Sequence, residues 1–135
     1  MRRIAFIDAA HHKETKSSRF LLDFLSPFFE IDVYWDGSHL GELKPDVTVI
    51  EQDNYDIIFI FQIGTDLNVY SRIDCRSIVC VPPLFLNENY ESENFPRNFK
   101  YLCLSKAQHR RLSLMGRESK WFQYYPNPFD FDPYR

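Results

Sequence analysis

Glycine is scarce in this sequence: only 4 of the 135 residues are Gly, and none stands between Asp8 and Arg19. A dinucleotide or nucleoside triphosphate site needs a Gly-rich turn directly after the first strand, where backbone amides approach the phosphates. The sequence contains no GxGxxG pattern and no Walker loop. We therefore exclude a nicotinamide or nucleoside triphosphate site in this chain.

Long apolar runs and a strong charge bias are also missing. No stretch approaches the roughly 20 apolar residues of a membrane-spanning helix, and the apolar run after Arg3 stops at Asp8, too soon for a signal peptide. The net charge is -3 and the pI is about 5.8, which gives no overall attraction to nucleic acid. We therefore expect a cytoplasmic protein without a nucleic-acid partner, and leave open a contact with the inner face of the plasma membrane.

Cysteine is sparse as well, and its spacing indicates neither a disulfide framework nor a metal site. The 3 cysteines are odd in number, and Cys80 and Cys103 sit in apolar runs typical of buried strands, whereas Cys75 lies just before one of them. Reduced, buried thiols are the expectation.

Histidines are the other candidate metal ligands. His11 and His12 are adjacent, and His39 and His109 lie far from them in the sequence. We expect neighbouring histidines after a strand to point apart, and we find no close Cys or carboxylate partner for them in the sequence. The sequence therefore predicts no metal site, and no cofactor is expected.

What the sequence does contain is a series of short apolar runs that alternate with helical patterns. This order predicts an α/β fold: a Rossmann-like, doubly wound, mostly parallel sheet with helices on both faces in three layers. Strands are expected at 4–7, 29–35, 55–61, 77–81, 101–104 and 121–125, and helices near 20–28, 66–73 and 106–115. Residues 11–16 are expected to form a loop, with Thr15 or Ser17 capping the helix that follows, and the structure of 47–50 stays open.

In such sheets, ligands bind beyond the carboxyl ends of the strands. The segments to consider are therefore 8–15, 62–65, 82–88 and 105–106. A phosphoacceptor receiver domain shares this architecture and would also have Asp8 and Lys106 in these places. However, its phosphorylated carboxylate would stand where this chain has Gln62, so we reject that function.

The last third of the sequence carries the most specific pattern. A strand is followed by Ser and a helix in YLCLSKAQHRRLSLMG, and a second strand then enters a Pro-Asn-Pro turn in KWFQYYPNPFDF. In this the chain resembles the N-terminal domain of GT-B fold glycosyltransferases, particularly the group 1/family 4-like set. The resemblance implies a Rossmann-like, acceptor-side domain over 1–128, with 129–135 starting a linker to a C-terminal, donor-binding domain that is not in the sequence.

The resemblance also implies an activity. Such an enzyme moves a sugar from a nucleotide-sugar donor, held mainly by the C-terminal domain, to a glycan or lipid-linked acceptor, as in polysaccharide biosynthesis. The isolated domain is then expected to be inactive. The alternative is a stand-alone flavodoxin-like binding or regulatory module without catalysis.

The same resemblance points to residues that would meet the acceptor or the donor phosphates. In the loop after the first strand these are His11, His12, Lys13 and Thr15, which would otherwise form a solvated basic loop. After the third strand, Gln62, Gly64 and Thr65 could hold sugar hydroxyls or simply form a turn and a helix cap.

The remaining candidates follow the fourth and fifth strands. Glu88 and His12 are the candidates for a catalytic base, although the acidic loop around Glu88 favours a role as one of its surface charges. Lys106 is a candidate phosphate ligand next to the expected helix cap Ser105. Its helix is basic and could meet an anionic lipid together with Arg2, Arg3 and Lys16. Two departures from the family weaken the transfer of roles: no Gly-Gly turn follows the first strand, and Pro82-Pro83 stands where many members carry a His.

Overall fold

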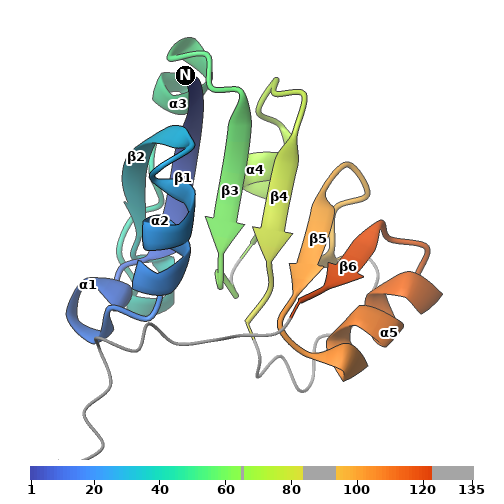
Figure 1. Cartoon of the computed structure of the whole chain (residues 1–135). Coiled ribbons are helices and arrows are strands. Elements are labelled where there is room, and N and C mark those ends of the chain that lie inside the picture. The colour runs from blue at the N-terminus through green and yellow to red at the C-terminus, as the bar shows by residue number, and fades with distance from the viewer. Residues whose placement is uncertain (65, 84–93, 123–135) are drawn as a thin grey trace, which may run out of the picture.

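The computed structural model describes residues 1–64, 66–83 and 94–122. These residues form one six-stranded sheet in which every neighbouring pair of strands is parallel, in the order β2-β1-β3-β4-β5-β6 (Figure 1). The expected α/β class and Rossmann-like layering are confirmed, and the sheet is fully rather than mostly parallel.

The strands and helices alternate from β1 to β4, and again from β5 to β6, as the sequence predicts. The strands are β1 (Arg2–Ala9), β2 (Phe29–Asp36), β3 (Ile57–Phe61), β4 (Ile78–Val81), β5 (Lys100–Cys103) and β6 (Ser119–Trp121). The helices are α1 (His12–Thr15), α2 (Arg19–Leu25), the 3-10 turn η1 (Ser38–Leu40), α3 (Val47–Gln52), α4 (Asn68–Ser71) and α5 (Lys106–Leu114).

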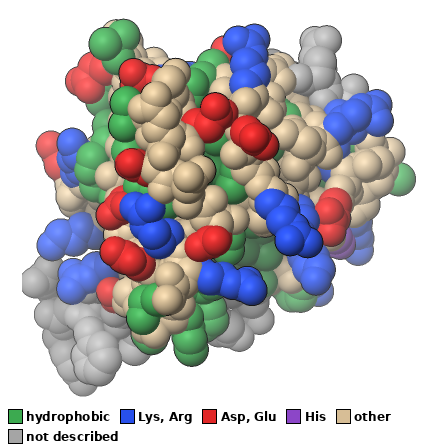
Figure 2. Space-filling view, turned by 90° about the horizontal axis from the view of Figure 1, so that it is seen from above, with side chains coloured by type: hydrophobic (Ala, Val, Ile, Leu, Met, Phe, Trp, Pro, Cys, Tyr) green, Lys and Arg blue, Asp and Glu red, His purple; other side chains and the backbone are tan. Residues whose placement is uncertain are grey.

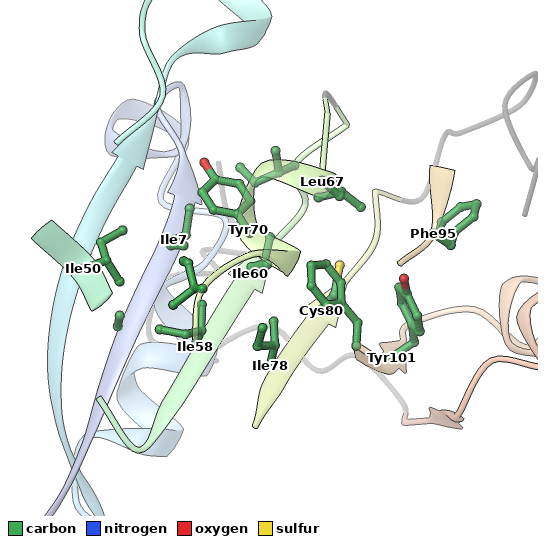
Figure 3. Packing of buried hydrophobic residues seen from close by; sticks show 14 of the residues in the cluster. Ile7, Ile50, Ile58, Ile60, Leu67, Tyr70, Ile78, Cys80, Phe95 and Tyr101 are labelled. Atoms are coloured by element: carbon green, nitrogen blue, oxygen red, sulfur yellow. The ribbon is translucent and has the colours of Figure 1, made fainter. Parts of the chain in front are cut away.

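The central strands are apolar on both sides because both faces of the sheet are covered. In β1, Ile4 and Phe6 face the cluster that contains Leu21 of α2, whereas Ala5 and Ile7 face the opposite cluster. That opposite cluster is the larger one, and it takes side chains from α3, α4 and α5, including Ile50, Tyr70 and Leu112. Figure 3 shows Ile50 and Tyr70 within this cluster.

These clusters define the three layers of the domain. In Figure 1, α2 lies in front of the sheet, and α3 and α4 lie behind it. Leu112 places α5 in the same buried cluster as Tyr101 and Cys103 of β5. Cys80 and Cys103 are buried and Cys75 is partly buried, and all are free thiols, as expected.

Three local expectations were wrong. Residues 11–16 are not all loop, because His12–Thr15 form the single turn α1. The residue before α2 is Ser18, not Thr15 or Ser17, and its hydroxyl does not cap that helix. The last strand begins earlier than expected, at Ser119, and is described only as far as Trp121.

Two further helix starts are explained by their caps. The segment 47–50, rich in β-branched residues, becomes part of a helix because the side chain of Asp46 accepts a hydrogen bond from the amide of Thr48. Ser105 caps α5 as expected, accepting a hydrogen bond from the amide of Gln108.

The strand order locates the natural ligand position. The chain moves from β1 outward to β2, then returns across β1 to β3, so the direction of winding reverses between β1 and β3. In doubly wound sheets, ligands bind beyond the carboxyl ends of the strands at this reversal. Asp8 pairs with Phe61 across β1 and β3, so the loops that begin at Ala10 and Gln62 meet there.

No helix among the described residues is both long enough and apolar enough to cross a membrane.

Candidate functional site

A buried carboxyl group lies at the centre of the carboxyl edge of the sheet. Asp8 is 0% exposed, and both of its oxygens accept short hydrogen bonds from the loop that follows β1. Nδ1 of His12 lies 2.5 Å from Oδ1, and the hydroxyl of Ser18 lies 2.5 Å from Oδ2. His12 follows Asp8 by four residues and begins the single turn α1. This turn folds the chain back onto the end of β1, which brings the two side chains together.

His12 is held on its other sides by aromatic rings. Its ring centroid lies 5.5 Å from that of Phe61, the last residue of β3, and 4.2 Å from that of His11. His12 is 4% exposed, and His11 is an exposed residue beside it. The expectation that these neighbouring histidines point apart was therefore wrong.

His11 also connects the loop after β1 with the loop after β2. Its Nδ1 lies 2.9 Å from Nε2 of His39 in η1, so the two rings share one hydrogen bond. Burial, followed by the nearby His12 and His39, lowers the pKa of His11 from its ordinary value of 6.5, and Asp8 opposes this shift in part. The pair favours neutral imidazole at His11 near neutral pH.

A second buried carboxyl group fixes the position of η1. Asp36 ends β2 and is 0% exposed. Its Oδ1 accepts hydrogen bonds from the amide of Ser38 at 2.9 Å and from its hydroxyl at 2.5 Å. Its Oδ2 accepts from Lys44 at 2.7 Å and from the Tyr70 hydroxyl.

The ionisation of Asp36 follows from these contacts. Burial alone would raise the pKa of Asp36, but the bonds from Lys44, Ser38 and Tyr70 outweigh it and hold that pKa below 3.8. Both oxygens of Asp36 have hydrogen-bond partners within the fold, so its role is structural. By fixing η1, Asp36 keeps His39 within hydrogen-bond distance of His11.

Gln62 has an unusual backbone at the end of β3. Its φ is +54°, in the left-handed region that residues other than Gly, Asn and Asp rarely adopt. The amide of Gln62 donates to the carbonyl of Val81 at 2.7 Å, which holds the turn against the end of β4. Gln62 is half-buried and Gly64 is exposed at this edge, and Thr65 lies outside the described residues.

Lys13 and Thr15 point to local partners. Nζ of Lys13 lies 5.0 Å from the ring centroid of Trp35, a cation–π contact. The hydroxyl of Thr15 lies 2.9 Å from that of Ser17. Both residues are exposed, so these contacts leave them accessible at the rim of the site.

Lys106 does not belong to the same place. It follows β5, and β3 and β4 lie between β5 and β1. With strands spaced about 4.8 Å apart, the ends of β1 and β5 are roughly 14 Å from each other. Glu88, the other candidate base, lies outside the described residues.

The basic residues that the structure describes do not form one surface. Arg3 lies near the start of β1, at the amino edge of the sheet, where its guanidinium donates to the carboxylate of Asp32 at 3.2 Å and to the carbonyl of Asp53 at 2.6 Å. Its main-chain amide donates to the carboxylate of Asp56 at 2.8 Å. Figure 2 looks onto this edge and shows Lys and Arg side chains interspersed with Asp and Glu. The expected combination of Arg2 and Arg3 with the basic helix after β5 is therefore wrong, because they lie at opposite ends of the strands.

Among the described residues, no group of three or more His, Cys, Asp and Glu side chains is placed to hold a metal ion. His109 in particular is on α5, and its Nδ1 lies 2.6 Å from the hydroxyl of Ser119.

Three members of this site were missed from the sequence. Asp8 was considered as part of the strand-end segment 8–15 and as a possible receiver-domain acid, but its contact with His12 was not predicted, although its spacing of four residues from His12 is a signal that could have been used. Ser18 was not expected to reach Asp8, and the contact of His39 with His11 spans 28 positions and has no local signal.

No protein-family model, curated protein or solved structure matches this chain. The chemistry of the site therefore rests on its own residues. It offers a histidine oriented by a buried carboxyl group, a second histidine that covers it, and a strained turn with a side-chain amide.

Proposed function

We propose that this chain is the acceptor-side, N-terminal half of a glycosyltransferase that takes a nucleotide-sugar donor and a glycan or lipid-linked acceptor. The observation that carries the proposal is the His12–Asp8 pair at the carboxyl end of β1, next to the reversal of strand order. A fully parallel sheet with this kind of pair at its ligand edge suits an enzyme that removes a proton from a hydroxyl group.

The roles of the pair follow from its hydrogen bonds. Asp8 accepts a hydrogen bond from Nδ1 of His12, which leaves Nε2 as the nitrogen that can take a proton. In the proposed step, an acceptor hydroxyl attacks the anomeric carbon of the donor sugar, and the bond from that carbon to the diphosphate breaks. The hydroxyl proton passes to Nε2 of His12, and the nucleoside diphosphate leaves with the electron pair. Asp8 holds the ring in place and stabilises its protonated form.

His11 and Gln62 would position the acceptor. Because His12 is 4% exposed and the ring of His11 lies 4.2 Å from it, an acceptor reaches His12 only when His11 moves aside. The His11 side chain is exposed and is held over His12 by one hydrogen bond to His39, so its movement would be local. The strained turn at Gln62 presents a side-chain amide that can both donate to and accept from sugar hydroxyls.

One observation favours the alternative, a stand-alone binding module. The order β2-β1-β3-β4-β5 is that of flavodoxin-like folds, here extended by β6. Such domains bind their ligands at the same reversal between β1 and β3, and they need no base there. Activity, rather than binding at this edge, therefore separates the two functions.

The binding half of the proposal can be tested on residues 1–135 alone. We expect neutral oligosaccharides to shift the backbone amide NMR signals of Ala10 to Lys13 and of Gln62 to Gly64. The variant Gln62→Ala should lose these shifts, and the matched variant Gln52→Ala, on the exposed side of α3, should keep them. Shifts confined to other strands, or equal binding by both variants, would count against an acceptor site here.

A further inference from the structure

A hollow lies beside the last two strands of the sheet, away from His12. It is a shallow cavity of about 590 Å³ between α5 and the edge strand β6. The side chains that line it are Lys106, His109, Arg110, Ser119, Lys120 and Trp121. Neither the transferase proposal nor the fold requires such a hollow.

The cavity gathers positive charge. Lys106, Arg110 and Lys120 are exposed, and none of the described residues that line the cavity is Asp or Glu. Within the described part of the chain, none of these cations forms an ion pair, unlike Arg3 with Asp32 and Lys44 with Asp36. Like charges from two separate elements repel one another, so an anion placed between them is favoured.

The walls of the cavity are fixed relative to each other. His109 of α5 and Ser119 of β6 are joined by a hydrogen bond of 2.6 Å. β6 also pairs with β5, Ser119 opposite Tyr101 and Trp121 opposite Cys103. α5 packs on β5 through Leu112, which lies in the same buried cluster as Tyr101 and Cys103. The cations therefore project from a preformed frame, and an anion would not have to order a loop in order to bind.

Trp121 adds an apolar wall to the charged one. Its side chain is 41% exposed, and Nζ of Lys106 lies 4.8 Å from the centroid of its ring. An exposed indole beside Lys and Arg suits a ligand that combines a phosphate with a ring, since the ring packs on the indole while the cations bind the phosphate. Lys106 is also the first residue of α5, where the helix dipole favours an anion.

We infer that this cavity binds a small organophosphate, with its phosphate held by Lys106, Arg110 and Lys120 and its ring or sugar packed on Trp121. The inference does not depend on the proposed transferase activity. A nucleoside diphosphate and a sugar phosphate both combine a phosphate with a ring, and the experiment below distinguishes them from each other and from a phosphate without a ring.

Trp121 supplies the reporter for the test. The sequence has 2 tryptophans, so Trp35→Phe leaves Trp121 as the one source of indole fluorescence. We would titrate this variant of residues 1–135 with pyrophosphate, UDP and glucose 1-phosphate at low ionic strength. We expect saturable changes in emission with pyrophosphate, which identifies the phosphate anchor. Tighter binding of UDP or of glucose 1-phosphate would identify the ring that packs on Trp121.

The charge requirement is tested in the same background. Arg110→Gln with Lys120→Gln should weaken pyrophosphate binding by at least about tenfold, because each charge-assisted contact is lost. The matched pair Arg2→Gln with Lys100→Gln removes the same charge from exposed positions outside the cavity and should leave binding unchanged. Phosphorus NMR of pyrophosphate with the unmodified chain repeats the measurement should Trp35→Phe fold poorly.

Two results would overturn the inference. One is the absence of saturable binding of any of these probes by the folded chain. The other is binding that the Gln pair in the cavity and the control pair weaken equally, which would assign it to overall charge. Binding to vesicles containing phosphatidylglycerol without binding to pyrophosphate would assign these cations to a membrane surface instead, and would also reject the inference.

Discussion

Nδ1 of His12 lies 2.5 Å from Oδ1 of Asp8, and both side chains are buried at the point where β1 ends. Histidines in loops after strands are ordinarily solvated, and a buried carboxyl group needs partners for both oxygens. Here one turn of helix, α1, supplies one of these partners, and Ser18 supplies the other. The same hydrogen bonds therefore stabilise the end of β1 and orient the histidine that we propose as the base.

Removing the carboxyl group should therefore destabilise the fold. Asp8→Ala leaves His12 and Ser18 buried without their acceptor, and we expect a loss of about 3 kcal/mol in the free energy of unfolding. Urea denaturation followed by circular dichroism measures it. Asp23→Ala is the matched control, because Asp23 is exposed and its contact with Arg19 is long at 3.9 Å, so it should cost less than about 1 kcal/mol. Equal stability of the two variants would contradict the hydrogen-bonded role of Asp8.

Asp36 should make the free energy of unfolding depend on pH in the acidic range. Its pKa is lowered in the fold, so its contribution is complete above the unfolded value, near 3.8, and is lost as the pH falls through the lower folded value. Lys44→Met leaves the buried carboxylate without its cation and should cost about 3 kcal/mol at neutral pH. This difference from wild type should shrink as Asp36 takes up a proton below pH 4.

Urea unfolding at a series of pH values tests the Asp36 prediction. Lys100→Met, an exposed position at the start of β5, serves as the control and should follow the wild-type curve. A difference between Lys44→Met and wild type that stays constant down to the lowest pH would show that Lys44 acts through packing rather than through the charge of Asp36.

His11 should titrate below its ordinary pKa of 6.5, because it is partly desolvated and faces His12 and His39. Its contribution to stability is then complete above that value and declines as the pH falls through the folded pKa. NMR titration of the imidazole signals measures the shift directly. His39→Gln should raise the pKa of His11 by removing one of its neighbours, and titration of His11 at or above 6.5 in the wild type would refute the contact geometry.

Gln62 should show a conflict between stability and binding. With φ at +54°, Gln62→Gly relieves the left-handed strain and should stabilise the fold by about 1 kcal/mol. The same change removes the side-chain amide and should abolish acceptor binding. Asn54→Gly, at a comparable φ of +53°, is the control: it should gain less, because Asn tolerates this conformation, and it should bind normally. A destabilised Gln62→Gly would mean that the side chain has a structural role.

Much of the fold was predictable because its strands are continuous apolar runs. Ile4–Ile7 and Ile57–Phe61 can be buried on both faces only inside a parallel sheet, and this decided the class of the fold. The segment from Val47 to Ile50 could not be assigned in the same way. Its β-branched residues favour a strand, but the segment forms a helix because Asp46 caps its first turn.

The site was only partly predictable, because its contacts are set by tertiary structure. His11 and His12 were recognised from their position after β1, which is a rule of topology. His12 meets Asp8 because the turn α1 folds the chain back onto the end of β1. His11 meets His39 because Asp36 bonds to Ser38 and so fixes η1 beside the first loop. A polar segment such as 11–16 contains no apolar period from which that turn could be inferred.

The central claim is that His12 takes the proton of an acceptor hydroxyl during sugar transfer. The most direct measurement is the rate of nucleoside diphosphate release, with sugar acceptors present, by the native reading frame that contains residues 1–135. We predict that His12→Gln lowers kcat by about 100-fold or more, whereas the neighbouring exposed change Glu14→Gln stays near the wild-type rate. Transfer at the wild-type rate by His12→Gln would contradict the assigned base, and a native protein that transfers no sugar would contradict the enzyme itself.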